Sequence, residues 1–180
     1  MGTLRLKLAV VVAVLGAVAV AAVAIAHDRG AFKTRLSGFE EVPVVITDAG
    51  GRFEARISRT EQKIEWTLSY ANLNADVTQS HIHVGQELVN GGISVWLCGN
   101  PSATVTPPPG TQACPARSAE LSGTATPDDI VGPVAQGVQP KAFDTLVRAL
   151  RSGVTYANVH TTQSPGGEIR GQIRDEGAHR

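Results

Sequence analysis

Arg52-Phe-Glu-Ala-Arg-Ile57, followed after a polar turn by Lys63-Ile-Glu-Trp-Thr-Leu-Ser-Tyr70, is the stretch of sequence that decides the fold. Apolar residues occupy every second position in both segments, and charged or polar residues lie between them. This period of two is typical of strands with one buried face and one solvated face. The stretch therefore predicts two antiparallel strands joined by a turn over residues 58–62.

Further strands and one helix are predicted along the rest of the chain. Segments 92–98, 154–160 and 167–174 have the length and the Gly, Pro and Asn boundaries of strands. Between 140 and 153 the apolar residues follow helical spacing: Phe143, Leu146, Val147 and Leu150. Pro140 suits the first turn of this helix and Gly153 its C-terminal cap, while Thr126 suits the start of another short helical turn. The predicted fold is mainly β, an antiparallel β-sandwich or barrel with one covering α-helix.

The first 26 residues have the pattern of a signal peptide. Arg5 and Lys7 precede an apolar run that ends in Ala24-Ile-Ala26, a small-x-small cleavage pattern directly before His27. The run also approaches the roughly 20 residues that span a bilayer, so the competing prediction for residues 1–26 is an uncleaved N-terminal membrane anchor. In both cases the remaining chain is expected to be secreted or extracytoplasmic. It is expected to be tied to a membrane only if the segment stays uncleaved.

The charge balance excludes partners that require a basic surface. The 180 residues include 16 basic and 16 acidic side chains. Cleavage after residue 26 removes Arg5 and Lys7, which leaves 14 basic against 16 acidic residues and a formal charge of −2. Nucleic acid is therefore not an expected partner. The length that remains suits one domain with a single core.

Cys98 and Cys114 are the two cysteines of the chain. An isolated pair in a small exported domain is most simply a disulfide, and the segment between them is rich in Pro, Thr and Gly, as in a loop. A metal-binding or catalytic thiol is the alternative, but thiol catalysis needs a nearby histidine and none adjoins either cysteine in sequence. We predict a Cys98–Cys114 disulfide.

Histidines form the one constellation with evident chemical potential. His81 and His83 are two residues apart in a strand-like segment, so both project from one face. His160 lies in another predicted strand, and Glu168 lies just beyond the turn that follows it. If the four converge, the imidazoles can hold Cu or Zn, with Glu168 as a ligand or as the group that orients one. The alternative is a structural hydrogen-bond network, with His160 donating to a backbone carbonyl and Glu168 pairing with Arg170 or an imidazole.

Three motifs together resemble the CHRD domain, a module repeated in the extracellular protein chordin and found singly in bacterial secreted proteins. They are Leu36-Ser-Gly-Phe-Glu-Glu-Val-Pro43, Ser80-His-Ile-His83 and the segment from Tyr156 to Ile173. The resemblance places a CHRD domain at 32–174 and leaves 175–180 as a polar tail. It implies an immunoglobulin-like barrel similar to that of the copper/zinc superoxide dismutases, whose paired copper ligands His81-Ile-His83 resembles. Between His83 and His160 there is no further histidine, so the dismutase ligand set does not carry over.

The function expected from the resemblance is that of an exported, non-catalytic binding or structural module, whose partner is a protein or an envelope ligand. Motifs for a serine nucleophile, a phosphate-binding loop or a dinucleotide site are absent from the sequence. The alternative is a mononuclear Cu- or Zn-binding metalloprotein built on the histidines, with superoxide-dismutase-like redox activity a more remote expectation. The sequence leaves the two readings open.

Overall fold

The computed structural model describes residues 30–58 and 62–177, and its architecture is one antiparallel sheet folded into two layers. Along the sheet the strands follow the order β5-β4-β7-β8-β1-β2-β3-β6, and β9 pairs with β1. The strands are β1 (Ala31–Ser37), β2 (Gly50–Ser58), β3 (Lys63–Ala71), β4 (Val77–Val84), β5 (Gly92–Gly99), β6 (Ala119–Ala125), β7 (Thr155–Thr161), β8 (Ile169–Gln172) and β9 (Arg174–Asp175).

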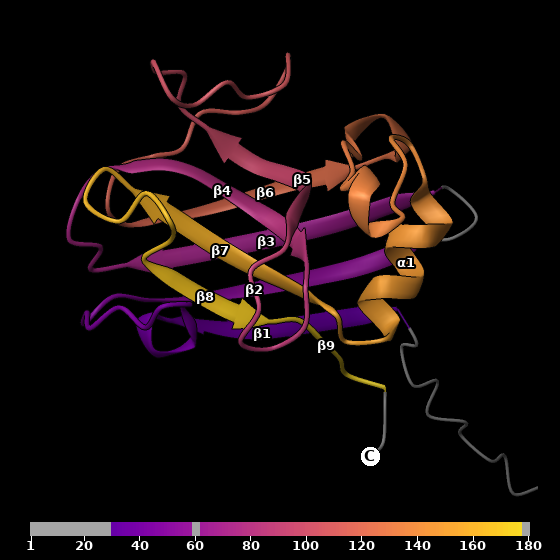
Figure 1. Cartoon of the computed structure of the whole chain (residues 1–180), viewed down its shortest axis with the longest axis horizontal. Coiled ribbons are helices and arrows are strands. Elements are labelled where there is room, and N and C mark those ends of the chain that lie inside the picture. The colour runs from indigo at the N-terminus through magenta and orange to yellow at the C-terminus, as the bar shows by residue number, and fades with distance from the viewer. Residues whose placement is uncertain (1–29, 59–61, 178–180) are drawn as a thin grey trace, which may run out of the picture.

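The layer that contains β4, β7 and β8 lies in front of the layer that contains β1, β2 and β3 in Figure 1. The layers are continuous at the β8–β1 junction, where only Ser37 and Arg170 are paired. At the opposite side the edges β5 and β6 approach without pairing as strands. There the Gln112 amide donates to Leu97 O (3.0 Å) and to Ser122 O (3.3 Å), which links the two edges. The predicted mainly β, antiparallel sandwich or barrel is thus confirmed.

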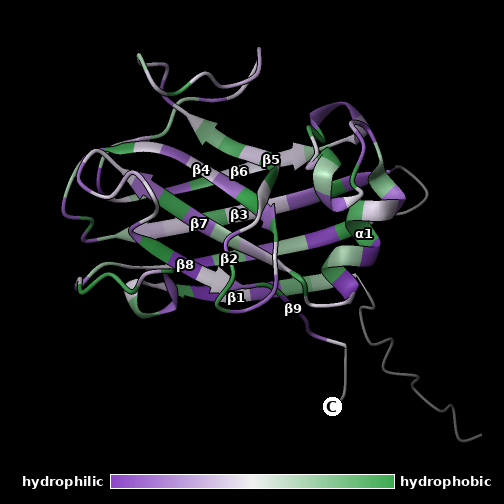
Figure 2. Cartoon of the chain, viewed as in Figure 1, coloured by the Kyte–Doolittle hydropathy of each residue, from purple (hydrophilic) through white to green (hydrophobic). Residues whose placement is uncertain are grey.

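Alternation along the strands separates the core from the surface, as the colours of β2 and β3 show in Figure 2. The two strands of the opening stretch pair antiparallel as predicted, with Phe53 opposite Leu68 and Ala55 opposite Trp66. All four side chains are buried. The fully buried core joins both layers and the helix: Phe32, Phe53, Leu68, Ile82, Leu97, Leu146, Val159 and Ile169.

The predicted helix is α1 (Phe143–Arg151), which lies at one end of the two layers (Figure 1) and buries its four apolar residues. Gly153 (φ 66°) donates to Leu150 O, and Val154 donates to Ala149 O, so the expected glycine cap is a Schellman motif. Pro140 does not lie in the first turn as expected. Lys141 has φ 67°, which is outside the right-handed helical region, so the helix begins only at Phe143.

Short 3₁₀ turns complete the fold: η1 (Gly38–Glu40), η2 (Pro127–Asp129) and η3 (Val134–Gln136). Thr126 caps η2 as predicted, through a capping box in which the Asp129 carboxylate accepts from the Thr126 backbone N–H and hydroxyl. The predicted signal peptide or anchor at 1–26 lies outside the described residues. Among the described helices, none has the length and apolarity needed to cross a membrane. In the predicted tail, Asp175 pairs with Phe32.

Cys98 and Cys114 form the predicted disulfide, with their Cα atoms 5.0 Å apart. The bond fastens the end of β5 to the long connection toward β6. Within this loop the Asn100 side chain donates to Cys114 O (2.9 Å) and accepts from Cys114 N (3.0 Å).

Removal of the disulfide is expected to lower the free energy of unfolding by about 3 kcal/mol, because it closes a loop of 16 residues. Urea denaturation of the wild type and of a Cys98→Ser/Cys114→Ser variant measures the loss. The chain has two cysteines, so titration of the native protein, purified without reductant, should find no free thiol. Reactive thiols in that native protein would contradict the assignment.

Candidate functional site

β4 and β7 place three histidines on the face of their layer that points away from the core. Ile82 on β4 and Ala157 and Val159 on β7 belong to the apolar core. The alternate residues, His81 and His83 on β4 and His160 on β7, therefore lie on the other face. The sequence prediction that His81 and His83 share a face is consistent with this arrangement.

Two irregularities in the pairing of β4 with β5 bring an aromatic side chain to the histidines. The register shifts between Ser80 and His81 and again between Ile82 and His83, so that His81 pairs with Trp96. The indole meets the His81 ring edge-on at 4.3 Å between centroids. Bulges of this kind commonly redirect side chains beside functional sites.

The connection between β4 and β5, residues 85–91, covers this outer face. Figure 1 shows it running in front of β7 and β8. It is fastened by hydrogen bonds from Gln172 Nε2 to Gly85 O (2.9 Å) and from Gly91 N to the Tyr156 hydroxyl (3.1 Å). His81 is 0% exposed, and His83 and His160 are each 7% exposed.

Arg170 holds the centre of the same connection. Its guanidinium is buried, and it donates to Asn90 Oδ1 (3.2 Å) and to the carbonyls of Gln86 (3.1 Å) and Val89 (2.9 Å). The guanidinium carbon also lies 3.5 Å from the centroid of the Tyr156 ring. His83 stacks on the same ring at 4.7 Å, with 3° between the planes. The charge of Arg170 is therefore separated from His83 by the Tyr156 ring.

Two of the imidazoles are oriented by backbone carbonyls. Nδ1 of His83 donates to Gly91 O (3.0 Å), and Nδ1 of His160 donates to Pro165 O (2.9 Å). A proton held on Nδ1 leaves the Nε2 lone pair of the neutral ring free. Carbonyl partners of this kind orient metal-ligating histidines in proteins. His83 Nε2 is buried and has no hydrogen-bond partner among the described residues.

His81 completes the cluster. Its Nδ1 lies 3.3 Å from His160 Nε2, while its own Nε2 is buried without a partner in the described part of the chain. Oδ1 of Asn158 lies 3.0 Å from the same His160 nitrogen. His160 Nε2 and Asn158 Oδ1 are both acceptors when His160 carries its proton on Nδ1. Their short distance therefore requires a proton or cation between them, or an Asn158 amide turned so that its NH₂ group faces the ring. One ring nitrogen from each of the three histidines falls within 4.8 Å of the others.

Burial keeps the three imidazoles neutral. Desolvation lowers the pKa of His83 and of His160 to about 4, even though each receives help for its charged form from a carbonyl. The pKa of His81 is lowered well below 6.5 by desolvation, and further by His160 and His83. Neutral imidazoles are the form that binds metal.

Glu168 does not join the histidines. Its fully buried carboxyl group accepts from Thr161 Oγ1 (2.8 Å), Asn74 N (2.8 Å) and Thr47 Oγ1 (3.1 Å). The group therefore ties together three segments distant in sequence. Nor does Glu168 pair with Arg170, whose guanidinium bonds to the 85–91 connection instead.

Glu41, within the motif at 36–43, is a buried acidic group. It is 5% exposed, and burial raises its pKa to about 7 although Arg170 acts in the opposite direction. Oε1 of Glu41 has no partner among the described residues. Gly167 leaves room for this carboxyl group, because a Cβ there would lie 2.3 Å from Oε1.

The sequence prediction named the three histidines and missed their surroundings. Trp96 alternates with buried Val95 and Leu97, so its outward position was available as a signal. The carbonyls of Gly91 and Pro165 and the burial of Arg170 had no signal in the sequence. These features arise from connections that cover the sheet.

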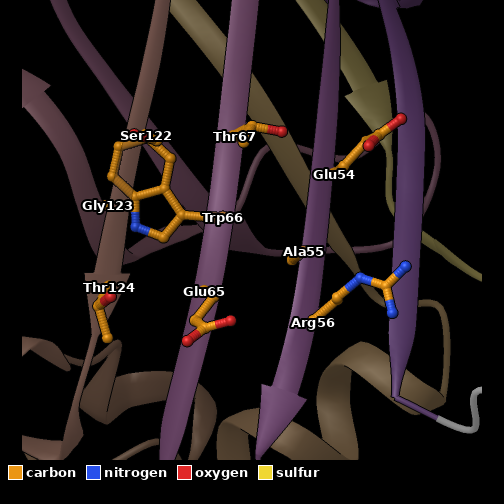
Figure 3. Close-up of a pocket in the computed structure, with 9 residues that line it drawn as sticks. All are labelled: Glu54, Ala55, Arg56, Glu65, Trp66, Thr67, Ser122, Gly123 and Thr124. Atoms are coloured by element: carbon orange, nitrogen blue, oxygen red, sulfur yellow. The ribbon is translucent and has the colours of Figure 1, made fainter.

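A separate hollow of about 390 Å³ lies on the other layer, over β2, β3 and β6. Figure 3 shows the Trp66 indole lying across Gly123, with Glu54, Arg56 and Glu65 around the hollow. Gly123 is required there because a Cβ would lie 2.4 Å from the indole. The hollow is lined by none of the three histidines.

Comparison with known proteins gives one match. A family model described as the CHRD domain matches residues 32–173, most of the chain. No curated protein and no solved structure matches. The immunoglobulin-like or dismutase-like form of the barrel therefore stays a prediction.

Replacement of Glu168 by Ala is expected to lower the free energy of unfolding by about 3 kcal/mol, because three donors lose one buried acceptor. Glu168→Gln retains one carbonyl oxygen and should cost less. Urea denaturation of both variants without added metal measures the effect. A loss in Glu168→Ala no larger than that of an ordinary surface substitution would contradict this structural role.

The metal-free protein is expected to lose stability as the pH falls from 6.5 to about 4. In that range the unfolded chain binds protons on imidazoles that stay neutral in the native state. Glu41 acts in the opposite direction, because its raised pKa adds stability that is lost as the pH rises from 4.5 to about 7. The combined effect of three histidines is larger than that of one carboxyl group. The free energy of unfolding should therefore rise with pH between 4.5 and 6.5, by about 1.4 kcal/mol per pH unit for each net proton.

Urea denaturation at several pH values in the presence of a chelator measures this dependence. His160→Asn is the matched variant, because its amide can still donate to Pro165 O while one titrating ring is lost. Its pH dependence should be smaller by about one proton. A stability that does not change between pH 7 and pH 5 in the wild type would contradict the assignment.

Proposed function

The chain belongs to the CHRD domain family, and we propose that it is an exported, non-catalytic binding module whose histidine cluster holds one Cu or Zn ion. The observation that carries the proposal is the convergence of His81, His83 and His160, with one ring nitrogen of each within 4.8 Å of the others. All three rings are buried, and burial keeps them neutral at neutral pH.

The spacing of the nitrogens supports a metal of this size. Two nitrogens bound to one tetrahedral ion at about 2.0–2.1 Å lie about 3.3 Å apart. His81 Nδ1 and His160 Nε2 have this separation of 3.3 Å. His83 is oriented by Gly91 O and completes a three-nitrogen set of the kind that suits Zn and Cu.

Export and a binding role have their own support. The Cys98–Cys114 disulfide is compatible with an oxidising, extracellular compartment, and CHRD is an extracellular domain family. The site is closed rather than open to a substrate, since none of its histidines is more than 7% exposed. A closed metal site with three neutral ligands stabilises a module or carries a metal more readily than it turns over a substrate.

Metal content decides between this proposal and a purely structural network. The full chain, expressed with its own N-terminal segment and purified without an affinity tag, is expected to contain or take up close to one Cu or Zn per chain by elemental analysis. His83→Asn and His160→Asn should lower the metal affinity by more than about 100-fold, beyond the cost of losing an outer hydrogen-bond partner. Each Asn can still donate to the carbonyl that the histidine used.

Two variants serve as controls. Glu168→Gln should keep the metal, because its carboxyl group is bonded to Thr47, Asn74 and Thr161. His179→Ala should also keep it, because His179 is outside the proposed ligand set. Wild-type protein that neither contains nor takes up Cu or Zn would leave the histidines with a structural role only and would overturn the proposal.

A further inference from the structure

The charge around the histidine cluster bears on which ion it selects. The three proposed ligands are neutral, and the Arg170 guanidinium is the charged group close to them. It is 2% exposed and lies 3.5 Å from the centroid of the Tyr156 ring, on which His83 stacks at 4.7 Å. From there its positive charge disfavours a second positive charge at the cluster.

The guanidinium of Arg170 has no carboxylate hydrogen-bond partner among the described residues. It donates to neutral acceptors, Asn90 Oδ1 and the carbonyls of Gln86 and Val89. Glu41 is buried, and its raised pKa of about 7 leaves about half of it protonated at pH 7, so it offsets the charge only in part. Glu168 is bonded elsewhere. Within the described residues, a divalent ion bound by the three imidazoles thus brings two positive charges to a site without an anionic ligand.

The number and kind of ligands also favour a monovalent copper ion over Zn²⁺. Zn²⁺ is almost always four-coordinate and takes water or a further side chain beyond three histidines. The described cluster offers three nitrogens, and the Trp96 indole covers His81 edge-on. Imidazole suits copper as well as zinc, and Cu(I), a d¹⁰ ion, is stable in three-coordinate sites without a fourth ligand. A closed three-nitrogen site beside an aromatic ring suits it.

We propose that the cluster is a Cu(I) site, selective for monovalent copper over Zn²⁺ and Cu²⁺, and that the buried charge of Arg170 sets this preference. The inference rests on the metal site proposed above and names its ion. The extra unit charge of a divalent ion, about 11 Å from the guanidinium across the Tyr156 ring and the His83 imidazole, weakens binding about 10-fold at an effective dielectric constant of about 20.

Competition measurements on the untagged full chain test the preference. Cu(I) affinity is measured anaerobically against a chromogenic Cu(I) chelator, and Zn²⁺ affinity against a Zn²⁺ chelator. Cu(I) should bind at least about 10-fold more tightly than Zn²⁺, the effect expected of the extra charge. Copper in the loaded protein should also stay silent in electron paramagnetic resonance after exposure to air. Equal or tighter Zn²⁺ binding, or a Cu²⁺ signal that accounts for all the copper, would overturn the inference and leave the metal site standing.

Variants of Arg170 isolate the contribution of its charge. Arg170→Gln removes the charge and should raise Zn²⁺ affinity about 10-fold relative to Cu(I) affinity. Arg170→Lys keeps a cation over Tyr156 and should preserve the wild-type preference. Equal selectivity in the two variants would show that charge does not set it. If either variant fails to fold, the wild-type competition still decides the ion, and failure to bind any of these metals would overturn both proposals.

Discussion

The site depends on the mutual burial of Arg170 and the connection between β4 and β5. A buried guanidinium without partners costs several kcal/mol, and so do backbone carbonyls removed from water without donors. Arg170 donates to the carbonyls of Gln86 and Val89, so each side satisfies the other. The connection held in this way ends at Gly91, whose carbonyl orients His83. The position of an imidazole is thus coupled to a charge on a strand two removed in the sheet.

Covering the outer face of the sheet changes the protonation of its histidines, compared with a strand whose outer face is solvated. A solvated pair of histidines titrates near 6.5 and is partly protonated in mildly acidic surroundings. In the buried cluster, desolvation lowers the pKa of His83 and His160 to about 4. Their lone pairs are therefore available over the whole physiological range. Burial supplies both the closed geometry and the protonation state that metal binding requires.

Alternation in the sequence predicted much of the fold, because each strand has one apolar face and the core is built from those faces. It also predicted that His81 and His83 point the same way and that His160 can join them. It failed for Glu168, since the chain turns between Thr161 and Glu168 and the carboxyl group is bonded to Thr161 there. The start of α1 was misplaced because the left-handed backbone at Lys141 has no local signal. Contacts with covering loops depend on tertiary structure and cannot be read from spacing.

The structural and the metal readings of the histidines share one hydrogen bond, since His160 donates to Pro165 O in both. The two interpretations differ in how they account for buried ring nitrogens that have no hydrogen-bond partner. A network selected for stability alone would use its buried nitrogens, because each unsatisfied polar atom costs about 1–3 kcal/mol. Nε2 of His83 is buried and has no partner among the described residues, in a cluster where one ring nitrogen of each histidine lies within 4.8 Å of the others. A buried lone pair left in this way is costly in a purely structural network and useful as a metal ligand, and this favours a cation at the cluster.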